Sequence, residues 1–341
     1  MFRADGGPEI GSGHVMRSLA LAAAWCSSGG RAEFVSHSAD GDLLRRLNGL
    51  GIAHSDPGGR RSLAPDREFT AGRVRELSAA WVVVDGYEFD IGYYADVRAA
   101  GARLCVIDDG VRLDRYEVDL LIDQNADATG RAYPTGASDV CLLGPDFAQL
   151  RPEFVNSLRD GRTIPENVNR ILVTMGGSDP TNLTMLAIDA LADSPDLGHD
   201  VVVVVGPGNE QAEEIRARIS GIPGVRYLQS PENMAEVMAS VDLAVASAGS
   251  SMLEMAFLGL PAIVLVAADN QVSGAKGFSE LGAVVNLGPG DEDFSELLRS
   301  TVSSVANDRP TREAMSRRGM ATVDGRGAQR VVDEMLRISD R

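Results

Sequence analysis

Short apolar runs alternate with amphipathic segments along most of the chain. Helical spacing of apolar residues is clear at 14–26, where Val15, Leu19 and Ala22 fall on one face. In the first half we expect further helices at 42–49 and 92–99, and strands at 1–4, 31–36, 81–85, 103–107, 120–122 and 140–143. Strands that alternate with helices in this way predict a parallel sheet covered by helices on both faces.

The second half repeats this alternation after a break. Residues 151–169 form a polar stretch interrupted by Pro152, Gly161 and Pro165, which we interpret as a connection between domains. Beyond it we expect helices at 182–192, 211–219, 233–239 and 251–258, and strands at 170–175, 201–205, 225–228, 243–246 and 262–266. After residue 266 the pattern predicts only helices, and we expect the last one, at 328–338, to fold back across the first domain.

The fold class that follows is α/β, with two Rossmann-like domains. We place the first at 1–155 and the second at 165–325, followed by a C-terminal helix within 326–341. A length of 341 residues suits two domains better than one oversized core. Open parallel sheets bind ligands at the carboxyl ends of their strands, so we expect the two domains to face each other across a ligand-binding cleft.

The charge balance excludes one class of partner. The chain has 49 acidic and 32 basic residues, a net charge of −17, whereas nucleic-acid binding depends on many contacts from Lys and Arg. Lys276 is the only lysine. Any phosphate must therefore be held by backbone amides, hydroxyls and arginine. A P-loop, which needs a lysine after its glycines, is excluded.

The chain shows no sign of export or membrane insertion. Cys26, Cys105 and Cys141 lie far apart in apolar surroundings, which is typical of reduced, buried thiols in a cytoplasmic protein. The sequence shows no signal peptide, and no apolar run reaches the roughly 20 residues that span a bilayer. The first expected strand is very short and leaves open whether residues precede Met1.

The first segment that carries chemistry follows the first strand and its Asp5. It reads GSGHVMR, with Gly11 and Gly13 before a predicted helix. Glycines let the backbone approach a ligand closely, and a helix N-terminus attracts anions. His14 stands at that N-terminus, which favours the neutral imidazole that a general base needs, and Arg17 follows on the same face. We interpret the other histidines, His37, His54 and His199, as structural.

Two further glycine loops follow predicted strands in the second half. Each loop leads from an apolar strand into a helix, which suits the backbone amides and hydroxyls for holding a diphosphate. The alternatives, a tight turn for the first loop and a serine-capped helix for the second, explain each loop alone nearly as well. Glu254, one turn into its helix, is placed to accept hydrogen bonds from a ribose. The candidate nucleotide-binding residues are Gly176, Gly177, Ser178, Gly249, Ser250, Ser251 and Glu254.

Polar residues also follow three other strands. Asn270 and Gln271 come after the strand at 262–266 and could form hydrogen bonds with the hydroxyls or amides of a sugar. The segments 84–87 (VDGY) and 106–109 (VIDD) occupy equivalent positions in the first half. The consecutive aspartates of VIDD, Asp108 and Asp109, allow a metal site, although a capped turn is the better interpretation. The candidate substrate-binding residues are Asp5, Gly13, Arg17, Tyr87, Asn270 and Gln271.

Taken together and in order, these motifs resemble the family of UDP-2,4-diacetamido-2,4,6-trideoxy-β-L-altropyranose hydrolases of pseudaminic acid biosynthesis and their spore-coat polysaccharide relatives. The similarity extends from residue 2 to about residue 271. The matching stretches are FRADGGPEIGSGHVMRSLALA, VVVDGY, VIDDGVR, DLLIDQN, LLGPDFAQLRPEF, ILVTMGGSDPTN, AGSSMLEMAFLGLPAIV and AADNQ.

The resemblance implies a glycosyltransferase-B fold with UDP held mainly by the second domain. It also implies hydrolysis without a metal or cofactor, in which water attacks the anomeric carbon with inversion and UDP leaves. In that reaction His14 would be the general base, Tyr87 and Asn270 would contact the sugar and its acyl groups, and Glu254 would contact the ribose. The sequence departs from the family pattern where Gly86 replaces a usual His, Ala248 a usual Gly and Phe147 a usual Tyr. These differences concern the identity of the sugar more than the class of reaction.

Two other functions stay open at this point. The same fold could transfer the sugar to an acceptor, as a glycosyltransferase does. Alternatively, the protein could bind a nucleotide sugar without turnover. A dehydrogenase is disfavoured, because no GxGxxG with a later acidic residue follows the first strand.

Overall fold

A computed structural model describes the chain except residues 8–9, 38–40, 59–61, 137–138, 158–160, 193–199, 290–293 and 341. The described residues divide into two units. The first unit comprises Met1–Gly6, His14–Arg151 and Arg326–Arg341, and the second comprises Gly7–Gly13 and Pro152–Gly325. The chain therefore enters the second unit briefly, between β1 and the helix that begins at Gly13, before it returns to the first.

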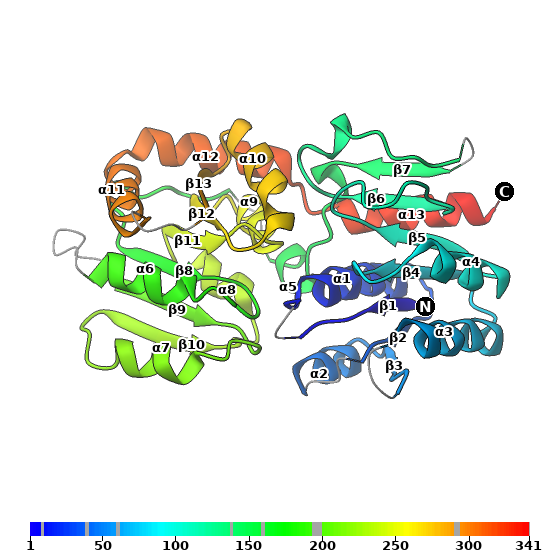
Figure 1. Cartoon of the computed structure of the whole chain (residues 1–341). Helices are drawn as coiled ribbons and strands as arrows, with labels where there is room; N and C mark the ends of the chain where they lie inside the picture. The colour runs from blue at the N-terminus through cyan, green and yellow to red at the C-terminus, as the bar shows by residue number, and fades with distance from the viewer. Residues whose placement is uncertain are drawn as a thin grey trace. The chain divides into compact units, whose positions relative to one another are not determined.

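The first unit is built on a seven-stranded parallel sheet with the order β3-β2-β1-β4-β5-β6-β7 (Figure 1). The strands are β1 (Phe2–Ala4), β2 (Glu33–Val35), β3 (Ala53–Ser55), β4 (Trp81–Asp85), β5 (Arg103–Ile107), β6 (Leu120–Asp123) and β7 (Val140–Leu143). The helices are α1 (Gly13–Ser27), α2 (Gly41–Gly49), α3 (Leu63–Leu77), α4 (Ile91–Ala99) and α13 (Gly327–Ser339), with 3₁₀ turns η1 (Ala128–Gly130) and η2 (Pro145–Phe147). The strand order reverses between β1 and β4, which is where such sheets bind ligands.

Helix α13 completes the core of the first unit although it lies at the far end of the chain. Its Val331 and Val332 are fully buried and pack in one cluster with Phe2 of β1 and Ile107 of β5. In Figure 1 this helix, drawn in red, lies against the strands drawn in cyan. The amphipathic spacing of α13 supplies the apolar face that one side of the sheet requires.

The second unit holds a six-stranded parallel sheet with the order β10-β9-β8-β11-β12-β13. The strands are β8 (Arg170–Thr174), β9 (Asp200–Val205), β10 (Val225–Gln229), β11 (Leu243–Ser247), β12 (Ala262–Val266) and β13 (Val285–Pro289). The helices are α5 (Pro152–Val155), α6 (Leu183–Ala192), α7 (Ala212–Ile219), α8 (Met234–Ala239), α9 (Ser251–Phe257), α10 (Val272–Glu280), α11 (Phe294–Asn307) and α12 (Arg309–Thr322), with a 3₁₀ turn η4 (Asp269–Gln271). Here the order reverses between β8 and β11.

The expectation of two parallel α/β sheets is confirmed, but β3, β13, α3 and the short helix α5, within the stretch interpreted as a connection, were missed. The strands β3 and β13 have too few apolar residues to stand out, and the prediction of helices alone after residue 266 was therefore wrong. The 15-residue helix α3 was missed for a different reason. Its buried face carries Asp66 and Thr70 beside Ala71 and Val74, so a search for apolar periodicity does not detect it.

The buried Asp66 meets an equally buried arginine from the central strand. Arg3 on β1 is 1% exposed, and it donates to both Asp66 and Asp5. Tyr93 also donates to Asp66, over 2.8 Å. Burial favours the neutral acid, but the hydrogen bonds and charge of Arg3 outweigh it and hold the pKa of Asp66 below its ordinary value. This ion pair fastens α3 to the middle of the sheet.

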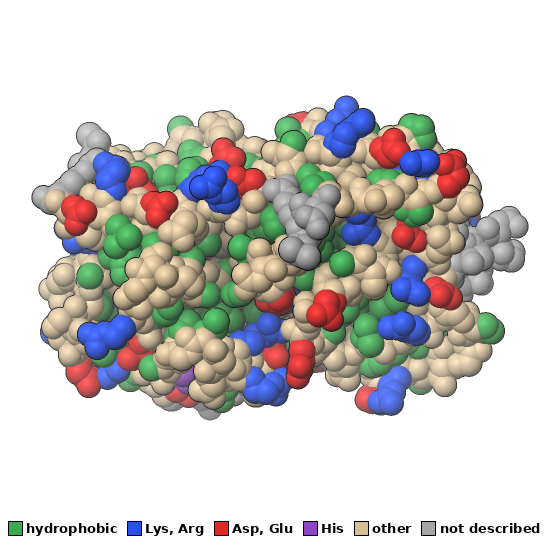
Figure 2. Space-filling model, turned by 180° about the vertical axis from the view of Figure 1, so that it is seen from behind, with side chains coloured by type: hydrophobic (Ala, Val, Ile, Leu, Met, Phe, Trp, Pro, Cys, Tyr) green, Lys and Arg blue, Asp and Glu red, His purple; other side chains and the backbone are tan. Residues whose placement is uncertain are grey.

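Surface charge and helix length bear on the partners of the chain. Acidic and basic side chains are interspersed over the face that Figure 2 shows. Within the described part of the chain, no helix combines the length and apolar character that crossing a membrane would require.

The Arg3–Asp66 pair gives a test of the fold. We expect Asp66→Ala to lower the free energy of unfolding by about 3–5 kcal/mol, because it leaves a buried guanidinium without its main counter-ion. Urea denaturation at neutral pH measures this. Glu76→Ala is the control, since it removes an exposed partner of Arg73 on the same helix and should cost less than about 1 kcal/mol. Equal losses in the two variants would contradict the role given to Asp66.

Candidate functional site

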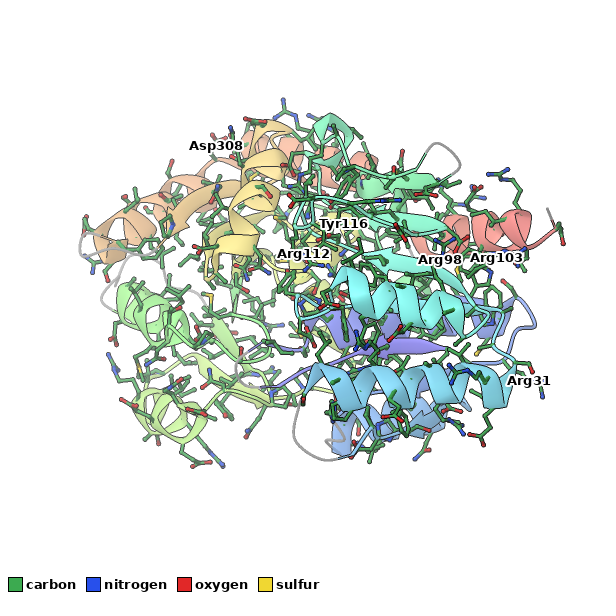
Figure 3. All side chains as sticks on the ribbon, turned by 45° about the vertical axis from the view of Figure 1, so that its right-hand side comes forward. Arg31, Arg98, Arg103, Arg112, Tyr116 and Asp308 are labelled. Carbon is green, nitrogen blue, oxygen red and sulfur yellow. The ribbon has the colours of Figure 1, made fainter. Side chains whose placement is uncertain are left out.

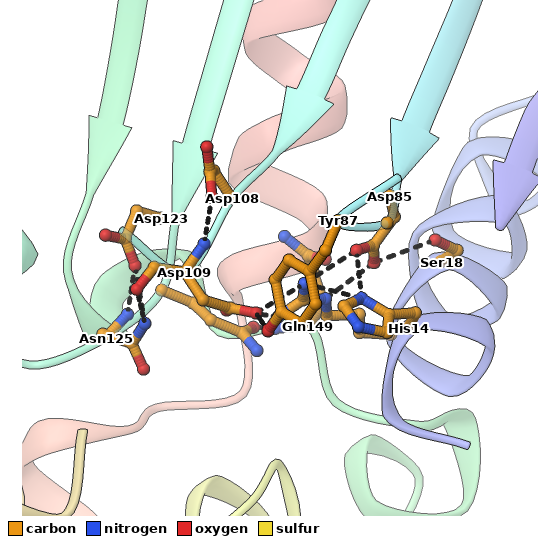
Figure 4. Close-up of polar contacts among 12 residues, drawn as sticks. His14, Ser18, Asp85, Tyr87, Asp108, Asp109, Asp123, Asn125 and Gln149 are labelled. Carbon is orange, nitrogen blue, oxygen red and sulfur yellow. Dashed lines mark hydrogen bonds and ion pairs between the residues drawn. The ribbon is translucent and has the colours of Figure 1, made fainter. Parts of the chain in front are cut away.

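His14 lies at the start of α1 and pairs with a buried carboxylate at the end of β4. Its Nδ1 is 2.6 Å from Oδ1 of Asp85, which is fully buried (Figure 4). An ionised carboxylate can only accept, so Nδ1 must carry the proton of this hydrogen bond. In the neutral ring Nε2 is then unprotonated and can act as a base. The strand order of the first unit reverses between β1, which precedes His14, and β4, which ends at Asp85.

Arg17, one turn further along α1, joins two carboxylates. Its Nε donates to Asp85 Oδ2 over 2.6 Å and its Nη1 donates to Asp109 Oδ1 over 2.5 Å. Burial acts against ionisation of Asp85 and Asp109, but the charge of Arg17 prevails and holds the pKa of each carboxyl below its ordinary value. Arg17 is only 6% exposed. The prediction that it binds substrate stays untested, and its observed contacts stabilise the acidic partners of the site.

Tyr87 is the exposed member of this group. Its hydroxyl donates to Asp109 Oδ2 over 2.6 Å, and its ring meets the His14 ring edge-on with centroids 4.7 Å apart. With 38% of its surface exposed, it can contact a ligand beside His14. A Cβ on the preceding Gly86 would lie 2.6 Å from Glu88 Oε2 and 2.7 Å from Phe89 Cε2. The histidine usual in the resembling family would thus require these neighbours to move.

The consecutive aspartates after β5 form a turn and not an open metal site. Asp108 accepts hydrogen bonds from the Asp109 amide over 2.8 Å and from Arg112 Nε over 2.8 Å. Tyr116, which Figure 3 labels beside Arg112, also donates to Asp108. The interpretation of a capped turn agrees with these contacts, since arginine side chains already neutralise both carboxylates.

In the second unit three loops meet at the carboxyl ends of adjacent strands. They follow β8, β11 and β12, so the point where the strand order reverses lies among them. A Cβ on Gly176 would lie 3.4 Å from Ser247 Oγ, and one on Gly249 would lie 3.6 Å from Gln271 Nε2. Gln271 also accepts a hydrogen bond from the Ala267 amide over 2.9 Å. The predicted glycines and Gln271 are therefore neighbours.

The glycine loop at 11–13 packs on this same edge of the second unit. A Cβ on Gly177 would lie 2.6 Å from Ser12 Oγ and 3.0 Å from the Ser12 amide nitrogen. A Cβ on Gly13 would lie 3.9 Å from Ser250 Oγ. Only glycine at position 177 leaves room for the loop that runs directly into His14.

The remaining predicted residues are placed as follows. Asp5 is 2% exposed and accepts from Arg3, Ser36 Oγ and the His37 amide, which sets it among structural contacts. Glu254 is 5% exposed in the first turn of α9, and Asn270 is exposed in η4.

Ligand atoms of Asp5, His37 and Asp66 lie within 4.8 Å of one another, a geometry that could hold a cation, but Arg3 already pairs with both aspartates. His37 and His54 make structural contacts, to Asp66 and to the Ser36 carbonyl, whereas His199 lies outside the described residues. All three cysteines are free, and only Cys105 is fully buried.

Two carboxylates of this site were not linked to it by the sequence. Asp85 and Asp109 were noticed only as polar residues after strands, and nothing in their spacing linked them to His14 or Arg17. The signal that could have found them was the adjacency of β1, β4 and β5, which depends on the sheet order and not on the local sequence.

Comparisons with known proteins fit this geometry. A profile of the glycosyltransferase family 28 C-terminal domain matches residues 170–331. The crystal structure of CalG4, the calicheamicin glycosyltransferase, superimposes with a TM-score of 0.67 at 16% identity, over 100% of this chain and 98% of that one. The chain has a glycosyltransferase-B fold. This was the fold that the motif resemblance implied, and it is confirmed.

The curated proteins that are similar in sequence to this glycosyltransferase-B chain include the following two. Spore coat polysaccharide biosynthesis protein SpsG of Bacillus subtilis is 31% identical over 206 residues, which are 60% of this chain and 60% of the relative. The chain therefore spans less than two thirds of that relative. UDP-2,4-diacetamido-2,4,6-trideoxy-beta-L-altropyranose hydrolase of Campylobacter jejuni is 21% identical over 286 residues, covering 83% of this chain and 96% of the relative.

The ion pairs of Arg17 predict a pH-dependent effect on stability. Carboxyls with a lowered pKa stabilise the fold above their ordinary pKa near 4, and this contribution is lost as the pH falls further. We expect Arg17→Met to lower the free energy of unfolding by about 3–5 kcal/mol at pH 7, because Asp85 and Asp109 lose their shared cation. The deficit should shrink progressively as the pH falls below about 4, because wild type loses this stabilisation gradually between the ordinary pKa of the carboxyls and their lowered pKa in the fold.

Urea denaturation at several pH values measures this deficit. Arg98→Met is the control, because Arg98 is 41% exposed and 3.7 Å from Asp119, and its effect should stay small at every pH. A deficit for Arg17→Met that does not change with pH would show that the ion pairs are not its cause.

Proposed function

We propose that the protein hydrolyses a UDP-activated diacetamido-deoxy sugar, releasing UDP and the free sugar. The observation that carries the proposal is the hydrogen bond between His14 Nδ1 and Asp85, which directs an unprotonated Nε2 away from the carboxylate. A neutral histidine held in this way is suited to remove a proton from water.

The proposed chemistry follows from that tautomer. The oxygen of a water molecule attacks the anomeric carbon while the bond from that carbon to the diphosphate oxygen breaks. The electron pair of that bond leaves with UDP, His14 Nε2 takes the proton of the water, and the anomeric configuration inverts. Asp85 stabilises the imidazolium that forms, and Arg17 keeps Asp85 ionised. As the resemblance implies, this reaction needs no metal ion.

The second unit is suited to hold the nucleotide. Its loops after β8 and β11 carry Ser178, Ser250 and Ser251 beside the point where the strand order reverses, where backbone amides and hydroxyls can bind an anion. This arrangement can bind a diphosphate without lysine. We propose that Glu254 binds the ribose and that Asn270 and Gln271 contact the sugar.

One of the peptide bonds that lead from one unit to the other lies between Gly13 and His14. Gly13 lies with the nucleotide loops, and the next residue, His14, belongs to the first unit. The loop that we propose binds the diphosphate is therefore followed immediately in the chain by the proposed base. The similarity to the Campylobacter hydrolase supports hydrolysis and the choice of sugar.

Transfer of the sugar to an acceptor is the second candidate. It is favoured by the match to a glycosyltransferase family domain and by the superposition on CalG4. The deciding experiment incubates the purified protein with UDP-linked diacetamido and acetamido sugars and follows UDP release and anomeric configuration by NMR. Release without an acceptor, with initial inversion, supports hydrolysis. UDP binding without release favours transfer or a non-catalytic binder.

The proposed base gives a direct test. We expect His14→Ala to lower kcat for UDP release by about 10²–10⁴-fold, because water then loses its proton acceptor, while the Kd for UDP changes little. His54→Ala, which removes a histidine that contacts only structural groups among the described residues, should leave turnover unchanged. An undiminished kcat in His14→Ala would exclude His14 as the base.

The proposed ribose contact predicts a change in nucleotide preference. A carboxylate that accepts from both ribose hydroxyls should make UDP bind about 10-fold more tightly than 2′-deoxy-UDP. Glu254→Gln should remove most of this preference, because the amide is a weaker acceptor. Isothermal titration calorimetry with both nucleotides measures it. A preference that survives the substitution would place the ribose elsewhere.

A further inference from the structure

An amide side chain at the edge of the first unit is held in one orientation. Asn125 follows β6 by two residues, and its Nδ2 donates to Asp123 Oδ1 over 2.9 Å and to the Asp109 carbonyl over 3.3 Å. Its backbone amide donates to the same Asp123 oxygen over 3.0 Å. Asp123 is itself held by Arg131 and by the Tyr133 hydroxyl.

These partners decide which way the amide of Asn125 faces. A carboxylate and a carbonyl are acceptors only, so the NH₂ group must face them and Oδ1 must point the other way. Figure 4 shows that oxygen directed away from Asp109 and Asp123. Among the described residues no group donates to it, and the side chain is partly exposed. The result is a fixed acceptor without a protein partner in the described chain.

This acceptor ends a row of contacts that begins at the proposed base. The His14 ring contacts the Tyr87 ring at 4.7 Å, the Tyr87 hydroxyl reaches Asp109 over 2.6 Å, and the Asp109 carbonyl accepts from Asn125. These residues follow β4, β5 and β6, which are neighbours in the sheet, or begin α1. Along this row of contacts, Tyr87 and Asp109 lie between His14 and Asn125.

We propose that Asn125 Oδ1 accepts a hydrogen bond from the substituent on carbon 4 of the sugar, the ring carbon opposite the anomeric carbon. The substrate class is then a UDP-sugar with an N–H or O–H donor at that position. Asn125 acts as a specificity-determining residue, because a sugar without this donor leaves the oriented acceptor unpaired. This inference rests on the proposed hydrolysis and names the feature of the sugar that the site reads.

The test compares UDP-sugars that differ only at carbon 4, with an acetamido group, a hydroxyl group or hydrogen there. For wild type we expect kcat/KM to be about 10–100-fold higher with the donor-bearing sugars than with the 4-deoxy sugar. Asn125→Ala should reduce this preference to about 3-fold or less, with little change for the 4-deoxy sugar. The acetamido and hydroxyl substrates distinguish an N–H donor from an O–H donor.

Two features of the design separate the possible failures. The preference is a ratio measured on one protein sample, so partial unfolding of the variant cancels, and Asn125→Ser provides a milder second variant. Asn48→Ala, an exposed asparagine on α2, is the matched control and should keep the wild-type preference. If wild type releases UDP but Asn125→Ala keeps the full preference, the inference is overturned and the proposed function stands. If wild type cleaves none of these sugars, both are overturned.

Discussion

The carboxylate of Asp85 is the group on which the polar edge of the first unit depends. It is fully buried at the end of a central strand, where an isolated charge would be strongly destabilising. Arg17 supplies the opposite charge and His14 supplies a hydrogen bond, and both residues lie in the first turns of α1. The same contacts therefore neutralise the carboxylate, attach the helix to the sheet and select the tautomer of the histidine.

The other polar residues of this edge are linked to Asp85 through Arg17. Arg17 has a guanidinium large enough to bridge two carboxylates, and its second partner, Asp109, in turn accepts from Tyr87 and Asn125. Each side chain is oriented by a neighbour that is itself hydrogen-bonded. Such support reduces the reorganisation needed when charge develops in a reaction. These contacts also explain why Arg17, which lies in a predicted binding motif, is buried and pairs with Asp85 and Asp109.

The second unit meets a different constraint, the close approach of backbone segments. Gly177 leaves room for Ser12, and a Cβ on Gly206 would collide with the carbonyl oxygens of Gly176 and Gly177. The chain has one lysine, so the diphosphate site proposed at this edge would depend on amides, hydroxyls and arginine. Glycine keeps those amides accessible where a larger side chain would separate the loops.

The sequence by itself determined the α/β class, most elements, and the loops that carry His14, Gly177 and Ser250, because apolar periodicity and glycine turns are local properties. It did not reveal α3, whose buried face is polar because Asp66 forms an ion pair with the buried Arg3, 63 residues away in the sequence. Only the tertiary structure decided that Asp85 orients His14, that Arg17 faces two carboxylates, and that Asn125 presents its oxygen outward. These arrangements depend on which strands are neighbours in the sheet, and strand order is set by the packing of the whole unit and not by any local stretch of sequence.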